Sequence, residues 1–125
     1  MKFINTNQVP QVVGPYSQAV IAGGLVFCSG QIALDEEGKM AEGGVRVQTT
    51  RVLKNLFAVL KASGSDIDRI LKTTVYLKDM GDFADMNMVY AELLGDHRPA
   101  RATVAVAGLP KGALVEIDCI AEINE

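Results

Sequence analysis

The sequence alternates six strand-like segments with only two helix-like segments, and this ratio constrains its fold more than any other feature. In the two helix-like segments, 45–63 and 83–94, apolar side chains recur at helical spacing. The order β-β-β-α-β-α-β-β predicts an α+β domain with a six-stranded mixed sheet. The strand-like segments are short runs of apolar or β-branched residues: 2–5, 19–22, 25–29, 70–77, 102–106 and 114–123.

Two helices are too few to cover both faces of such a sheet, so we expect both to pack on one face. The other face is then open in a single chain, yet its residues are not typical of a surface that faces water. In the strand 102–106, both alternating sets of side chains are small or apolar. A sizeable apolar face without a cover is usually an interface. We therefore expect a homo-oligomer with cyclic symmetry, in which sheets of neighbouring subunits pack on each other.

Turn and cap residues mark the ends of several segments. Gly23-Gly24 predicts a hairpin between the second and third strands. Gly64 follows the first helix, where a left-handed C-terminal cap usually lies, and Gly95 ends the second helix. We expect Asp82 to cap the N-terminus of the second helix.

Length and composition indicate one domain, residues 1–125, with a core of its own: 49% of the residues are hydrophobic and 22% are charged. The net charge of −3 argues against nucleic acid or an anionic membrane as a partner. The first residues lack the apolar run of a signal peptide, and no window is long enough to cross a bilayer. We therefore expect a cytoplasmic protein. In that reducing compartment, Cys28 and Cys119 are expected to be free thiols in the core.

Alternation of side chains along a strand predicts that Arg101, Thr103 and Glu116 share the open face of the sheet. If Val104 and Val115 face the helices, these three residues face the other way. A permanent cation and a carboxylate would then lie on a covered surface. Arg101 and Glu116 could form a structural ion pair there or belong to a functional site, and residue types alone leave both alternatives open.

Four motifs, in the right order, resemble those of the YjgF/RidA family, and the resemblance covers essentially the whole chain. The matching stretches are Gly14-Pro15-Tyr16-Ser17-Gln18-Ala19, Ser29-Gly30-Gln31-Ile32, residues 72–80 together with Asn87, and Pro99-Ala100-Arg101-Ala102-Thr103-Val104 continuing through 108–117.

The resemblance implies a chorismate-mutase-like fold that assembles as a homotrimer around a sheet-lined barrel, with sites in the clefts between subunits. It also implies hydrolysis of reactive 2-imino acids, such as 2-iminobutanoate and 2-iminopropanoate, to 2-oxo acids and ammonia. Such imines arise from pyridoxal-phosphate enzymes such as threonine dehydratase. No cofactor is expected for the hydrolysis itself, because an imine carbon is already electrophilic.

On this resemblance, Arg101 binds the substrate carboxylate, because its planar guanidinium fits a carboxylate in bidentate fashion. Glu116 orients or deprotonates the attacking water and later passes a proton to the departing nitrogen. The Tyr16 hydroxyl hydrogen-bonds the substrate or the water. An interface salt bridge remains the alternative for Glu116, and ordinary packing the alternative for Tyr16.

The predicted binding set also includes Thr103, Gly30, Ser29 and Asn87. Gly30 can offer backbone groups at close range, although a simple bulge or turn glycine is an equal alternative. Ser29 and Asn87 are weaker candidates and are expected to be structural hydrogen-bonding residues. Many deaminase-type members carry cysteine at the position of Thr103. Threonine keeps the backbone N–H and a small polar side chain, so a reaction that needs no thiol is expected to survive.

Other chemistries find little support in the sequence. His97 is the single histidine, and we expect it to be exposed in a loop; with two scattered cysteines it gives no metal-ligand spacing. No phosphate-binding glycine motif is present. Two alternatives to the deaminase stay open: a non-catalytic carboxylate binder with a regulatory or chaperone-like role, and an endoribonuclease or translation inhibitor. The acidic balance and the lack of a histidine pair argue against the latter.

Overall fold

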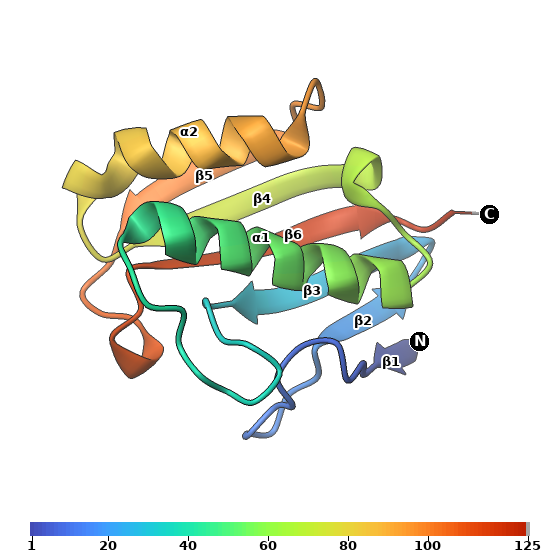
Figure 1. Ribbon diagram of the computed structural model, residues 1–125. Helices are drawn as coiled ribbons and strands as arrows, with labels where there is room; N and C mark the ends of the chain where they lie inside the picture. Colours follow the sequence, from blue (N-terminus) through green and yellow to red (C-terminus); the bar gives the residue numbers. More distant parts are fainter. Residues whose placement is uncertain (125) are drawn as a thin grey trace.

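Both helices pack on one face of a six-stranded sheet, as the sequence predicted (Figure 1). The computed structural model describes residues 1–124. The helices are α1 (Val45–Ala62) and α2 (Phe83–Leu94), and short 3-10 turns occupy η1 (Ile67–Arg69), η2 (Met80–Asp82) and η3 (Pro110–Gly112). The strands are β1 (Lys2–Ile4), β2 (Ala19–Ala22), β3 (Leu25–Gln31), β4 (Ile70–Leu77), β5 (Ala100–Ala105) and β6 (Val115–Glu122).

The strand order is β1-β2-β3-β6-β4-β5, so the last strand of the chain lies in the middle of the sheet. Strands β4 and β5 are parallel, and the other neighbouring strands are antiparallel. Parallel neighbours need a crossover connection, which α2 supplies. The sheet is therefore mixed, and β5 is one of its two edge strands.

The hydrophobic core lies between the sheet and the helices. Val52, Leu56 and Leu60 of α1 are fully buried and recur every fourth residue, which places them on one face of the helix. They belong to the same cluster as Val75 of β4 and Ile117 of β6. Each such side chain contributes about 1.5–3 kcal/mol by its removal from water, so this cluster fixes how the helices lie on the sheet.

The turn and cap predictions are confirmed except for one. Gly23 and Gly24 both have positive φ, 60° and 78°, as a tight hairpin requires. Gly64, after α1, has a φ of 80°. Asp82 occupies the N-cap position of α2, but its side chain makes no capping hydrogen bond. The 3-10 turn η2 leads directly into the helix instead, and Asp79 Oδ1 accepts the Gly81 N–H at 2.8 Å within that turn.

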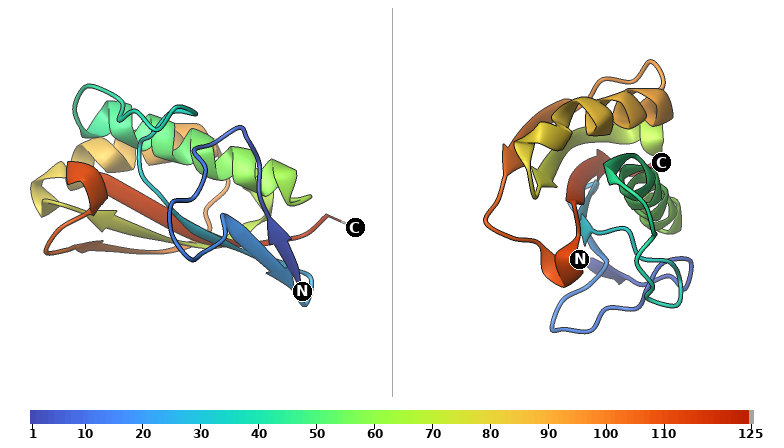
Figure 2. Two further views of the ribbon diagram at one scale, coloured as in Figure 1. Left: turned by 90° about the horizontal axis from the view of Figure 1, so that it is seen from below. Right: turned by 60° about the vertical axis from the view of Figure 1, so that its left-hand side comes forward.

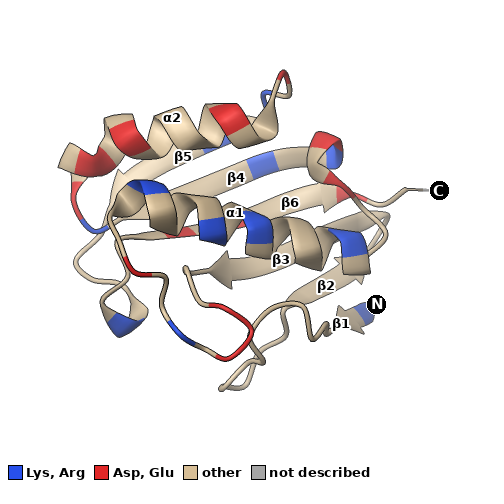
Figure 3. Cartoon of the chain, viewed as in Figure 1, with Lys and Arg blue, Asp and Glu red and all other residues tan. Residues whose placement is uncertain are grey.

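The two helices carry opposite charge, visible as blue on α1 and red on α2 (Figure 3). The ion pair between Arg46 of α1 and Asp85 of α2, with an N–O distance of 2.9 Å, joins them. Both side chains are more than half exposed, so this pair contributes at most about 1 kcal/mol. Within residues 1–124, no helix is both long and apolar enough to span a bilayer.

The face of the sheet opposite the helices carries large apolar side chains in contact with solvent. Phe3, Phe27 and Val104 are 68%, 44% and 43% exposed. Phe3 and Phe27 flank Val20 in a row across β1, β2 and β3. Figure 2 shows, at left, that both helices lie above the sheet and none below it. The expectation of an open apolar face is therefore confirmed for the single chain.

Candidate active site

A cavity of about 750 Å³ opens beside Glu116 of β6. It is bounded by the loop after β1, by the end of β3 and the loop that follows, and by η3. Four of the predicted site residues line it together. The lining residues include Val12, Val13, Tyr16, Ser29, Gly30, Ile32, Leu34, Glu36, Glu37, Lys111 and Glu116.

Glu116 points away from the helices, because its neighbours Val115 and Ile117 are fully buried on the helix side. Its backbone lies directly across from Tyr76 of β4. Burial raises the pKa of the Glu116 carboxyl above its ordinary value, and the charge of Asp118 raises it further. A raised pKa makes the Glu116 carboxyl a better proton acceptor than an exposed glutamate.

Gly30 makes room for the Glu116 carboxylate. A Cβ atom at Gly30 would lie 2.3 Å from Glu116 Oε2, which is far inside van der Waals contact. The pairing of β3 with β6 shifts between Cys28 and Gln31, so a bulge lies at this point. Any side chain at position 30 would displace Glu116, and the need for glycine here comes from this close approach rather than from a turn.

Tyr16 and Ser29 lie at the same cavity but differ in what they contact. Tyr16 is 55% exposed, and its N–H closes a tight turn by donating to the Gly14 carbonyl at 2.9 Å. Ser29 Oγ donates to the Ser17 carbonyl at 2.6 Å. Ser29 is therefore a structural hydrogen-bonding residue, as expected, and it ties the loop that carries Tyr16 to β3.

Arg101 lies on the opposite face of the sheet from Glu116, and the prediction that the two share a face is wrong. In the parallel pairing of β5 with β4, Arg101 lies beside Thr73 and Thr103 beside Val75. Thr73 and Val75 are buried against the helices, so Arg101 and Thr103 face the helices too. The half-exposed Val104 faces the open side instead. An Arg101–Glu116 ion pair within one chain is excluded by this arrangement.

The reason for the error is that β5 is an edge strand covered by polar and aromatic residues of α2. Arg101 Nη1 donates to Asn87 Oδ1 at 2.8 Å. The guanidinium lies 4.8 Å from the ring centre of Tyr90 and 5.5 Å from that of Phe83. Such rings attract a cation, so the helix side of β5 accepts an arginine that a purely apolar layer would not. Asn87 is thus a residue that fixes the position of Arg101.

Thr103 does not reach the cavity that Glu116 lines. Its hydroxyl is buried and has no hydrogen-bond partner among the described residues. It follows Arg101 by two residues, so both side chains lie on the helix side of the edge strand β5.

His97 is partly buried rather than exposed, because its ring forms a hydrogen bond with the Ile70 carbonyl, with Nε2 2.7 Å from the oxygen. Cys28 and Cys119 are free and buried, as predicted, and lie opposite each other on β3 and β6. The Cys28 thiol and burial both raise the pKa of Cys119, which makes it a poor nucleophile. Across residues 1–124, histidine, cysteine and acidic side chains form no group of three or more that could hold a metal ion.

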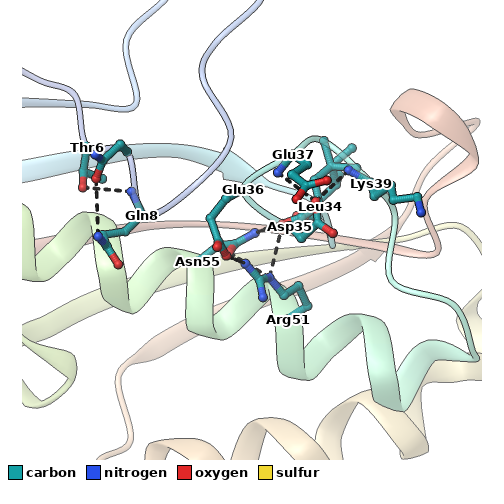
Figure 4. A network of polar contacts seen from close by, with 11 residues as sticks. Thr6, Gln8, Leu34, Asp35, Glu36, Glu37, Lys39, Arg51 and Asn55 are labelled. Atoms are coloured by element: carbon teal, nitrogen blue, oxygen red, sulfur yellow. Dashed lines mark hydrogen bonds and ion pairs between the residues drawn. The ribbon is translucent and has the colours of Figure 1, made fainter.

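The loop 32–44 forms one wall of the cavity, and α1 holds it in place (Figure 4). Asn55 Nδ2 donates to the Leu34 carbonyl at 2.8 Å, and Arg51 pairs with Glu36 at 2.8 Å. Within the loop, Asp35 Oδ1 accepts the N–H groups of Glu37 and Lys39, both at 2.9 Å, which lowers the pKa of Asp35. The sequence did not predict that this loop lines a cavity. The one signal for it was Asn55, a polar residue that is buried on α1.

Known proteins resemble this chain over its length. Residues 6–123 match the family model described as Endoribonuclease L-PSP. The chain is 52% identical to RutC family protein slr0709 of Synechocystis over 97% of this chain and 95% of that protein. It is 46% identical to Reactive Intermediate Deaminase A, chloroplastic, of Arabidopsis thaliana over 96% of this chain and 65% of that one. The crystal structure of E. coli TdcF with bound serine, 38% identical, has a TM-score of 0.94 and is matched over 99% of this chain and 100% of that one.

The fold, the cavity with Gly30 and Glu116, and these similarities agree with the motifs found in the sequence. The chain belongs to the Endoribonuclease L-PSP family, also called the YjgF/RidA family, which includes a protein named as a reactive intermediate deaminase.

Proposed function

We propose that this protein hydrolyses reactive 2-imino acids, such as 2-iminobutanoate and 2-iminopropanoate, to 2-oxo acids and ammonia. The observation that carries the proposal is the half-buried Glu116 at a cavity, with its pKa raised and with Gly30 against its carboxylate. A carboxyl group of this kind can take a proton from water and return it to nitrogen. The similarity to a reactive intermediate deaminase supports the same assignment.

In this proposal, Arg101 of a neighbouring subunit binds the substrate carboxylate. Within one chain, Arg101 and Glu116 lie on opposite faces and two strands apart, which separates their backbones by roughly 10 Å sideways alone. The open apolar face with Phe27 and Val104 supports an assembly through that face. We therefore propose a homotrimer around a sheet-lined barrel, in which the edge strand β5 of one subunit borders the cavity of the next. Thr103 enters the site with Arg101.

The reaction needs only positioning and proton transfer. The substrate enters as the protonated imine, and water adds to its carbon while the Glu116 carboxylate accepts one proton of the water, which gives a neutral carbinolamine. Glu116 then returns this proton to the nitrogen, the carbon–nitrogen bond breaks, and the carbinolamine hydroxyl gives its proton back to Glu116 as the carbonyl of the 2-oxo acid forms. Glu116 passes that last proton to the departing ammonia, which leaves as ammonium. The Tyr16 hydroxyl, at the mouth of the cavity, orients the water or the substrate. No cofactor takes part, and we place the reaction in the cytoplasm.

A non-catalytic binder of small carboxylates is the second candidate. The related structure with bound serine favours it, because serine is an amino acid with the same carboxylate. Both candidates use Arg101, so they differ at Glu116. A binder that lacks turnover should keep nearly the same affinity for a 2-oxo acid when Glu116→Ala is introduced, whereas the deaminase should lose turnover.

Cleavage of RNA is the third candidate, because the family description carries the name of an endoribonuclease. The net charge of −3 and the use of the single histidine, His97, in a hydrogen bond with a backbone carbonyl argue against it. Cleavage of RNA by highly purified protein, lost in the Glu116→Ala variant, would support this candidate over the other two.

The deciding experiment adds the protein to threonine dehydratase and threonine and follows the release of 2-oxobutanoate. The native protein should speed the release, and Arg101→Ala should abolish the effect because the substrate carboxylate loses its partner. Arg69→Ala, on the exposed turn η1, is the matched control and should behave like the native protein. A native protein that leaves the rate unaltered would sink the assignment.

A further inference from the structure

Glu116 has two polar neighbours on the open face that the proposed reaction does not use. Asp118 follows it by two residues on β6, so both carboxylates project from the same face. Tyr76 of β4 lies directly across from Glu116, and Thr74 lies across from Asp118. The Tyr76 hydroxyl donates to Asp118 Oδ2 at 3.0 Å, diagonally past its own cross-strand partner.

The hydrogen bond makes the two carboxylates unequal. Asp118 accepts a hydrogen bond from the Tyr76 hydroxyl, which holds its carboxylate in one position. No hydrogen bond is among the causes that shift the pKa of Glu116, and Gly30 lies against its carboxylate. Burial and the hydrogen bond to Asp118 also raise the pKa of Tyr76, so its hydroxyl remains a donor at neutral pH.

We propose that Asp118, held in place by the Tyr76 hydroxyl, is a positioning residue for the reaction proposed above: its fixed negative charge keeps the transferable proton on Glu116. Two carboxylates with different surroundings can divide the work: Asp118 accepts the hydrogen bond of Tyr76, and Glu116 exchanges the proton. The proton that Glu116 takes from water is then available for the departing nitrogen. The inference rests on the proposed function for its role in turnover.

Other charged or titratable groups also face Glu116 from the elements around the cavity. Burial and Asp118 are the causes of the raised pKa of Glu116, and Glu36 is paired with Arg51. The proposed assembly adds the cation of Arg101 from a neighbouring subunit. The groups that line the cavity are Tyr16, Glu36, Glu37 and Lys111. Tyr16, Glu36 and Glu37 lie on loops and Lys111 lies in η3, whereas Asp118 and Tyr76 lie on the paired strands β6 and β4, where the strand register fixes their positions relative to Glu116.

The test is the titration of the Glu116 carboxyl carbon by NMR, without substrate, in the native protein and in Asp118→Asn and Tyr76→Phe. Asp118→Asn should move the Glu116 midpoint to lower pH, because the neighbouring negative charge is gone. Tyr76→Phe should move it in the same direction but less, because Asp118 is charged but no longer held. The control Asp68→Asn removes an equal charge from the exposed turn η1 and should leave the midpoint in place.

The rate of imine hydrolysis gives the second readout. The pH midpoint of kcat should move with the Glu116 titration in both variants, while KM stays close to the native value because Arg101 is untouched. If Glu116 titrates at the same pH in Asp118→Asn and in Asp68→Asn, the inference is overturned. If Asp118→Asn fails to fold, a Glu116 midpoint in Tyr76→Phe equal to that of the native protein overturns it. If the native protein does not hydrolyse imines but the Glu116 midpoint still shifts in the variants, the proposed function is overturned. The coupling between the charges of Asp118 and Glu116 is then established on its own.

Discussion

Glu116 occupies a position that costs the folded chain stability. Its pKa is raised by burial and by Asp118, so the native state binds the proton more tightly than the unfolded state, whose glutamate pKa is about 4.3. Stability therefore falls as pH rises from that value through the native pKa. Glu116→Gln, which carries no charge at any pH, should melt at a higher temperature than the native protein near neutral pH.

The difference in melting temperature should disappear in acid, below the unfolded pKa, where the native Glu116 is protonated as well. Calorimetry of both proteins across this pH range checks the prediction. A Glu116→Gln variant that melts lower than the native protein at neutral pH would contradict this prediction, and would show that Arg101 of the neighbouring subunit, as proposed above, outweighs the effects of burial and Asp118.

At the residue scale, the sequence motifs drew attention to Gly30, Glu116 and Arg101. The alternation of side chains, however, placed Arg101 on the wrong face of the sheet. On the edge strand β5 one set of side chains contains Arg101 and Thr103 and the other contains Ala102 and Val104, so hydrophobicity alone assigned the wrong set to the helices. The register with β4 decides it, and this register depends on contacts between distant segments. The Tyr76–Asp118 hydrogen bond was unpredictable for the same reason.

At the element scale, the bulge in β3 is the feature that admits Glu116 to the cavity. Gly30→Ala should lower the rate of imine hydrolysis by at least about tenfold, because the new Cβ must displace the Glu116 carboxylate. Gly44→Ala is the matched control, since a Cβ there meets no atom within 4 Å. Steady-state kinetics and circular dichroism separate a misplaced carboxylate from a failure to fold. A Gly30→Ala enzyme as fast as Gly44→Ala would contradict this role of the bulge.

The second element with a direct role is α2, whose residues Phe83, Asn87 and Tyr90 all contact Arg101. Asn87→Ala removes a hydrogen bond to a charged group, worth about 1.5–3 kcal/mol, so kcat/KM should fall by roughly one to two orders of magnitude. Glu92→Ala changes an exposed position of the same helix and should have little effect. Equal kinetics for the two variants would show that α2 does not position Arg101.

At the scale of the whole molecule, the element order and the single helical layer were predictable because both follow from periodicity along the chain. The strand order was not, because β6 inserts between β3 and β4, which precede it in the sequence. That insertion puts Glu116 in the centre of the sheet while Arg101 stays on the edge strand and on the other face. A site that needs both residues must therefore combine two subunits.

Co-expression of Arg101→Ala with Glu116→Gln tests most directly the claim that each site combines residues of two subunits. Each variant alone should be inactive, since each lacks one half of every site. In mixed oligomers, a site is intact where the Glu116→Gln chain supplies Arg101 and the Arg101→Ala chain supplies Glu116. Random mixing of equal amounts should then restore about a quarter of the native rate of imine hydrolysis. Mixed oligomers, isolated by two different affinity tags, that remain as inactive as either variant alone would contradict a site shared between subunits.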